Sequence, residues 1–161
     1  MMPGTNIWPD PPDPNEELRV LIVEDNVIAL KSYMNHMRGL GASVRGVTSK
    51  REALDTAEQW QPNIVIIDVR LNGGPVGVGL GEAIREHSPK TKIGLMTGWA
   101  TSRDKRRAAE TRVGGGLTFK PIGRNTFEVA VQRVKHGQSP FPQIDEIECP
   151  QNDFTSEWMW G

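Results

Sequence analysis

The stretch IVIIDVRLNGG, residues 64–74, joins four apolar residues to an aspartate, Asp68, and then to glycines. A short, wholly apolar run of this kind is typical of a strand in a parallel sheet that is covered on both faces. Asp68 comes where the strand ends, so it is either a turn residue or part of a site at that edge of the sheet. The residues at the ends of the other predicted strands decide between these interpretations.

Four more short apolar segments predict strands, at residues 18–23, 43–47, 92–96 and 115–119. Helical patterns separate them, at residues 26–41, 50–60, 78–87, 101–113 and 125–137. In the first helix the apolar positions are three or four residues apart, at Val27, Leu30, Met34, Met37 and Leu40. Alternating strands and helices predict an α/β fold: a doubly wound five-stranded parallel sheet, flavodoxin-like order 2-1-3-4-5, with helices on both faces.

Composition predicts three segments. Residues 1–16 hold five prolines and indicate a disordered arm; residues 17–137 form the folded domain; residues 138–161 form an acidic tail ending in Trp158 and Trp160. The domain carries all 19 Lys and Arg but only 12 of the 20 Asp and Glu, so a basic body has acidic ends. The single cysteine, Cys149, excludes an internal disulfide. Without a spanning segment or a secretory signal, we expect a cytoplasmic protein without membrane contact.

Five polar residues follow the predicted strands. Glu24 and Asp25 end the first strand, Asp68 the third, Thr97 the fourth and Lys120 the fifth. Each alone has an ordinary explanation, as a helix-start acid, a turn residue, a loop hydroxyl or a solvated lysine. In a doubly wound sheet, however, the carboxyl ends of the strands line one crevice, where ligands bind. The set therefore predicts a shared site.

The chemistry of the site follows from its charges. Carboxylates that lie close together need protons or a hard cation, and Mg²⁺ takes oxygen ligands. We expect Asp25 and Asp68 to bind the ion directly and Glu24 to act through water. Asp68 then keeps one oxygen as a nucleophile, while Lys120 and Thr97 hold the oxygens of a phosphoryl group.

In order and approximate spacing, the motifs EDN (24–26), IIDVR (66–70), MTGWA (96–100) and FKPIG (119–123) resemble the response-regulator receiver domain of two-component signalling. The resemblance covers residues 18–137. It implies that Asp68 is the phosphoacceptor and that a histidine kinase or histidine phosphotransfer protein is the donor. It also implies Mg²⁺ at Asp25, Asp68 and the backbone carbonyl of Arg70, and a cis peptide before Pro121. Such a domain is not an enzyme beyond self-phosphorylation from small donors and autodephosphorylation.

The sequence departs from the family pattern in four places. Glu24 replaces the more usual aspartate, and Leu117 stands where many receivers carry the tyrosine or phenylalanine that swings inward with the threonine. The turn at residues 71–81 is longer and richer in glycine, so its backbone can approach the site or stay mobile. Trp99, two residues beyond Thr97, suggests a bulky rim that slows the hydrolysis of a phosphoaspartate.

Two other functions are compatible with the same residues: a receiver-like scaffold or dimerisation module without regulated phosphorylation, and a Mg²⁺-dependent phosphatase. The phosphatase lacks an acid that could activate a leaving group. The 24 residues after the domain are too few for a helix-turn-helix, so we expect no direct DNA binding. Signalling is expected to pass to a downstream protein partner.

The fourth predicted helix is crowded with basic residues, namely Arg103, Lys105, Arg106, Arg107 and Arg112. A solvated face is the first interpretation, followed by recognition of an acidic protein surface and then of nucleic acid. We hypothesise that the acidic tail docks on this face, within or between chains. A homodimer could form through the tail or through the face made by the fourth helix, fifth strand and fifth helix.

Overall fold

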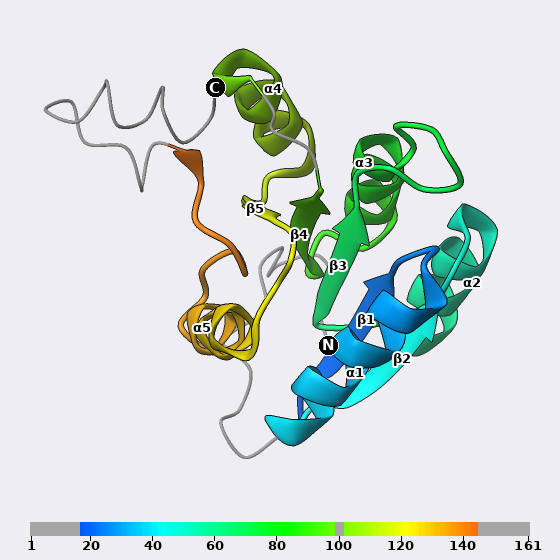
Figure 1. Cartoon of the computed structure of the whole chain (residues 1–161), viewed down its shortest axis with the longest axis vertical. Helices are drawn as coiled ribbons and strands as arrows, with labels where there is room; N and C mark the ends of the chain where they lie inside the picture. Colours follow the sequence, from blue (N-terminus) through cyan, green and yellow to red (C-terminus); the bar gives the residue numbers. More distant parts are fainter. Residues whose placement is uncertain (1–16, 99–101, 145–161) are drawn as a thin grey trace, which may run out of the picture.

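The computed structural model describes residues 17–98 and 102–144, which form a parallel sheet between two layers of helices (Figure 1). The elements in chain order are β1 (Arg19–Val23), α1 (Val27–Gly39), β2 (Ser43–Val47), α2 (Lys50–Trp60), β3 (Ile64–Asp68), α3 (Gly77–His87), β4 (Lys92–Thr97), α4 (Arg103–Val113), β5 (Leu117–Phe119) and α5 (Arg124–Lys135).

The strand order is β2-β1-β3-β4-β5, and every pair is parallel, so the predicted fold class and order are confirmed. The register pairs Asp68 with Met96, and Thr97 with Phe119. The last residues of β3, β4 and β5 therefore lie at one edge of the sheet, with the end of β1 beside them. This edge collects the polar residues that end the strands.

Each face of the sheet has its own core. The first core contains residues of α1 and α5, and the second contains residues of α2, α3 and α4. Strand β1 supplies both, since Val20 and Ile22 belong to the first core while Leu21 and Val23 belong to the second. Because successive side chains of a strand point to opposite faces, a central strand in this sheet must be apolar throughout.

Helix ends follow the predicted signals. The Ser49 hydroxyl accepts the Glu52 backbone N–H at 3.3 Å and donates to the Glu52 carboxylate at 3.0 Å, which closes the start of α2. Helix α1 differs from its predicted apolar face: its buried residues include Tyr33, whereas Val27 is 50% exposed. Val27 is the first residue of α1.

The packed chain continues past the predicted domain boundary at residue 137. After α5 the segment 138–144 returns along β5 towards α4 (orange in Figure 1). Phe141 and Ile144 are each 1% exposed, and Phe141 belongs to the core under α1 and α5. Isolated apolar residues among prolines show no periodicity, which is why the sequence predicted a tail from residue 138. Trp158 and Trp160 lie outside the described residues.

Helix α4 is only partly a solvated basic face. Arg106 is 2% exposed, and its Nε donates to Glu110 at 3.0 Å. Its Nη2 donates to the Leu117 carbonyl of β5 at 2.8 Å. This arginine thus ties α4 to the sheet, while Arg103, Lys105 and Arg107 are exposed.

Within residues 17–98 and 102–144, the helices are too short or too polar for any of them to cross a bilayer.

Candidate functional site

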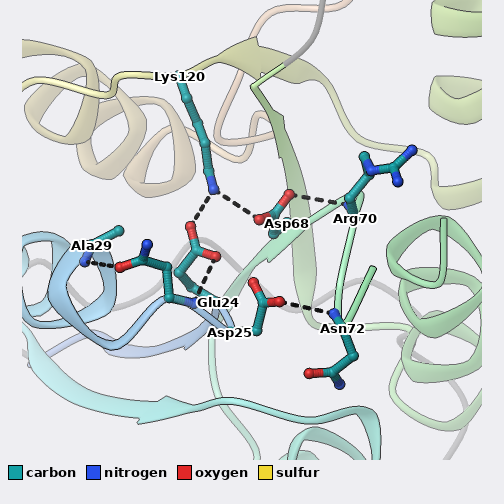
Figure 2. A network of polar contacts seen from close by, with 8 residues as sticks. Glu24, Asp25, Ala29, Asp68, Arg70, Asn72 and Lys120 are labelled. Carbon is teal, nitrogen blue, oxygen red and sulfur yellow. Dashed lines mark hydrogen bonds and ion pairs between the residues drawn. The ribbon is translucent and has the colours of Figure 1, made fainter. Parts of the chain in front are cut away.

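Three carboxylates meet at the carboxyl edge of the sheet. Glu24 and Asp25 follow β1, Asp68 ends β3, and one oxygen from each lies within 4.8 Å of the others. Figure 2 shows them facing a common space below Lys120. The structure therefore brings the three predicted acids within reach of one another.

Lys120 brings a positive charge from the segment after β5. Its Nζ donates to Asp68 Oδ2 at 2.7 Å and also bonds to Glu24 Oε1 (Figure 2). Partial burial would lower the pKa of Lys120, but its bonds to Asp68 and Glu24 raise that pKa above the ordinary value. Lys120 is thus held as a cation between the two carboxylates.

Backbone N–H groups fix the carboxylates from the other side. Asp68 Oδ1 accepts the N–H of Arg70 at 3.1 Å, and Asp25 Oδ2 accepts that of Asn72 at 2.9 Å. The Asn26 N–H donates to Glu24 Oε2 at 3.3 Å. Sequence reasoning did not identify Asn26 and Asn72, because every residue except proline carries such a donor.

The glycine-rich turn brings its backbone against the site. Gly73 has φ of 83°, a left-handed conformation that glycine adopts without strain. A Cβ at Gly77 would lie 2.1 Å from the Asp68 carbonyl oxygen, so only glycine allows α3 to start this close to β3. Of the two behaviours that the sequence allowed for this turn, close approach is the one in the structure.

Glu24 and Asp25 differ in burial and in the direction of their pKa shifts. Glu24 is 0% exposed, and burial, supported by the neighbouring Asp68 charge and opposed by Lys120, raises its pKa to about 7. Asp25 is less deeply buried; burial alone would raise its pKa, but hydrogen bonds, led by that from the Asn72 backbone, lower it. Ionised Glu24 is therefore costly unless another cation joins Lys120.

The donor set suits Mg²⁺. Three carboxylates supply the hard oxygen ligands that this ion prefers, and a single ammonium group leaves them with excess negative charge. The Arg70 backbone lies beside Asp68 through its N–H, which is compatible with the predicted carbonyl ligand.

The other predicted site residues lie at the same edge. Thr97 ends β4 with 3% exposure, and its carbonyl accepts the Lys120 N–H at 2.7 Å. The peptide bond between Lys120 and Pro121 is cis, as predicted. Leu117 is 2% exposed and packs in the core under α2, α3 and α4. Trp99, the predicted rim residue, lies outside the described residues.

A family model matches most of the chain. The family model described as "Response regulator receiver domain" matches residues 20–132. "Regulatory protein AtoC" of Escherichia coli strain K12 is 26% identical over 147 residues, which cover 89% of this chain. The chain spans only 30% of that protein's length.

Solved structures share the fold. Chemotaxis protein CheY4 of Vibrio cholerae is 27% identical with a TM-score of 0.67, covering 74% of this chain and 99% of that one. A CheY-like receiver domain protein of Methanospirillum hungatei is 22% identical with a TM-score of 0.69, covering 76% of this chain and 97% of that one. The receiver domain of a putative Luxo repressor protein of Vibrio parahaemolyticus is 20% identical with a TM-score of 0.68, covering 76% of this chain and 92% of that one.

Proposed function

This chain belongs to the response regulator receiver domain family of two-component signalling, and we propose that Asp68 is its phosphoacceptor. The observation that carries the proposal is that both carboxylate oxygens of Asp68 accept hydrogen bonds, one from Lys120 and the other from the Arg70 backbone N–H. A nucleophile oriented from both sides, beside two further acids, fits phosphoryl acceptance better than a turn residue does.

The donor is a phosphohistidine on a histidine kinase or histidine phosphotransfer protein. A carboxylate oxygen of Asp68 attacks phosphorus, an O–P bond forms and the N–P bond of the donor breaks. The electron pair of that bond stays on the imidazole nitrogen. Lys120 moves its hydrogen bond from the carboxylate to a phosphoryl oxygen, and Thr97 holds a second one.

Asp25, Asp68 and the Arg70 carbonyl would hold Mg²⁺ directly, with Glu24 acting through water. When bound, the ion neutralises charge on the carboxylates and on the phosphoryl oxygens. The role of this chain's own residues is to hold Asp68 in one orientation and to shield it from solvent, since its exposed fraction is 5%.

The output is a change in protein binding. Thr97 ends β4 and Lys120 follows β5, so a phosphoryl group held by them alters the surface made by α4, β5 and α5. We propose that a downstream protein, or a second copy of the chain, reads this surface. The alternative is that the chain binds partners as a scaffold without phosphorylation, and the two functions differ in whether Asp68 accepts a phosphoryl group.

The test is the mass of the intact protein after incubation with acetyl phosphate, with Mg²⁺ and with EDTA. We expect one phosphoryl adduct that requires Mg²⁺ and is absent in Asp68→Asn. Asp104→Asn is the matched control, because Asp104 is an exposed aspartate on α4 and is not a member of the carboxylate cluster. An adduct that persists in Asp68→Asn would refute the assignment.

A phosphorylated histidine kinase serves as the second donor. Transfer from the kinase without transfer from acetyl phosphate would still support Asp68 as the acceptor. Failure with both donors, in protein that binds Mg²⁺, would favour the scaffold.

A further inference from the structure

The segment after α5 is anchored beside α4. The Ile144 backbone N–H donates to both carboxylate oxygens of Glu110, at 3.0 and 3.1 Å. Glu110 is 4% exposed and is itself paired with the buried Arg106. Upstream, Phe141 is buried in the core, so the segment has two anchors. The described chain therefore ends, at Ile144, beside α4.

The part of α4 next to this anchor is basic. Arg107 and Arg103 precede Glu110 by about one and two helical turns, and both are exposed. They lie on the stripe of the helix that contains Glu110, about 10 Å from it at the far end. Three or four residues of extended chain cover that length.

The sequence that begins at this point has the complementary charge. Residues 145–161 carry five acids and no Lys or Arg, and three of the acids come first, at Asp145, Glu146 and Glu148. Their spacing matches the reach from Ile144 to Arg103. A tethered segment also has a high effective concentration at its own domain, which favours even weak ion pairs.

We propose that the outer face of α4 around Arg103 and Arg107 is a docking surface, and that its occupant is the acidic segment 145–161 of the same molecule. The segment lies antiparallel to α4 as the chain leaves Glu110, with its first acids against the two arginines. While the segment is docked there, the same basic face is covered against acidic surfaces of other proteins. This inference does not depend on phosphorylation.

The single cysteine, Cys149, lies within the proposed occupant and permits a direct test. A nitroxide label on Cys149 broadens the NMR signals of nearby backbone amides in ¹⁵N-labelled full-length protein. We expect the amides of residues 102–107 to lose most of their intensity at low salt. They should recover in 1 M NaCl, where charges are screened beyond about 3 Å.

Arg103→Glu/Arg107→Glu should abolish the broadening on α4. Lys50→Glu/Arg51→Glu is the matched control, because it makes the same charge change at exposed positions in the first turn of α2. The control should retain the broadening. Adding Asp145→Lys, Glu146→Lys and Glu148→Lys to the α4 double variant should restore it.

Three results would overturn the proposal. The α4 amides could keep their full intensity in the labelled wild type, or the broadening could survive in Arg103→Glu/Arg107→Glu. The third is broadening seen only between molecules, when a labelled unenriched copy is mixed with an unlabelled ¹⁵N copy. That result would make the occupant the tail of a second copy. None of these outcomes bears on acceptance of a phosphoryl group by Asp68.

Discussion

Lys120 is one cation among three carboxylates, and this imbalance governs the chemistry of the site. It contacts Glu24 and Asp68, whereas Asp25 accepts the backbone N–H of Asn72. Glu24 is the most buried of the acids, so its ionisation depends most on what else occupies the site. In the absence of a divalent cation, the site is therefore a local source of instability.

Glu24→Gln should stabilise the metal-free protein at pH 8. The folded pKa of Glu24, about 7, lies above the ordinary value of 4.5, so its contribution to stability is present below pH 4.5 and is lost as pH rises to about 7. Removing the charge should raise the free energy of unfolding at pH 8 on the order of 1 kcal/mol. Urea titration in EDTA measures it.

The same comparison at pH 4.5 should show a smaller gain, because Glu24 is then largely protonated in the folded protein. Glu128→Gln, an exposed change on α5, is the control and should alter neither value. A destabilised Glu24→Gln at pH 8 would show that its bond to Lys120 outweighs its desolvation.

Gly77→Ala should impair the site without touching a charged group. The added Cβ would meet the Asp68 carbonyl oxygen at 2.1 Å, so β3 or α3 must shift. We expect a loss of about 1–3 kcal/mol in stability and a slower rate of phosphoryl acceptance. Gly79→Ala is the matched control, because its Cβ would approach nothing nearer than 4.0 Å. Equal rates in the two variants would contradict the steric argument.

The residue types at the strand ends made the site predictable. The acids, the threonine and the lysine stand at the ends of four strands and carry their chemistry in their side chains, and the topology brings them together. The Asn72 and Arg70 backbone donors could not be predicted in the same way, because their role comes from the path of the turn. Burial of Arg106 was also missed, since a sequence pattern does not show which cation of a basic helix faces the sheet.

Among the elements, α4 shows how local patterns and packing diverge. Its sequence is the most polar of the helices, yet Arg106, Glu110 and Val113 face inward at helical spacing. Arg106 bonds to the Leu117 carbonyl and lies over the Phe119 ring, 5.4 Å from its centre. This buried ion pair thus takes the place of apolar side chains on the inner side of α4, and it links the helix to β5 and to Ile144.

Glu110→Ala should destabilise the fold by about 3 kcal/mol, because it leaves the buried Arg106 without its carboxylate and frees the Ile144 N–H. Glu82→Ala removes an exposed carboxylate paired with Arg112 and should cost far less. Thermal unfolding of both variants measures the difference. Similar losses would mean that the Arg106 pair adds no more than a surface pair.

At the scale of the whole molecule, the domain is completed by a segment without regular structure. Phe141 packs against β4, where a Cβ at Gly94 would lie 2.8 Å from its ring. Gly116 leaves room for the Phe141 carbonyl, since its Cβ would lie 1.9 Å away. The sequence predicted the ten regular elements and their order, but this packing depends on two glycines, Gly94 on β4 and Gly116 just before β5.

Phe141→Ala should lower the free energy of unfolding by about 3–5 kcal/mol, the usual cost of emptying a buried aromatic position. Val129→Ala on the outer face of α5 is the control, because Val129 is 54% exposed. Chemical denaturation followed by circular dichroism compares the two. A loss in Phe141→Ala no larger than in the control would show that the segment adds little to the fold.

The position of residues 138–144 also bears on aggregation. A sheet ends in two outer strands, here β2 and β5, and an uncovered outer strand is a template to which another chain can pair. Strand β2 carries the exposed Arg45, whose guanidinium stacks over Trp60, and an exposed charge of this kind discourages pairing. Beside β5 lies the returning chain, with the Phe141 carbonyl next to Gly116. A fragment that stopped at residue 137 would lack this segment, and the edge of β5 would be uncovered. The short length of β5, only Leu117–Phe119, would then limit pairing with another chain and so decide the solubility of the fragment.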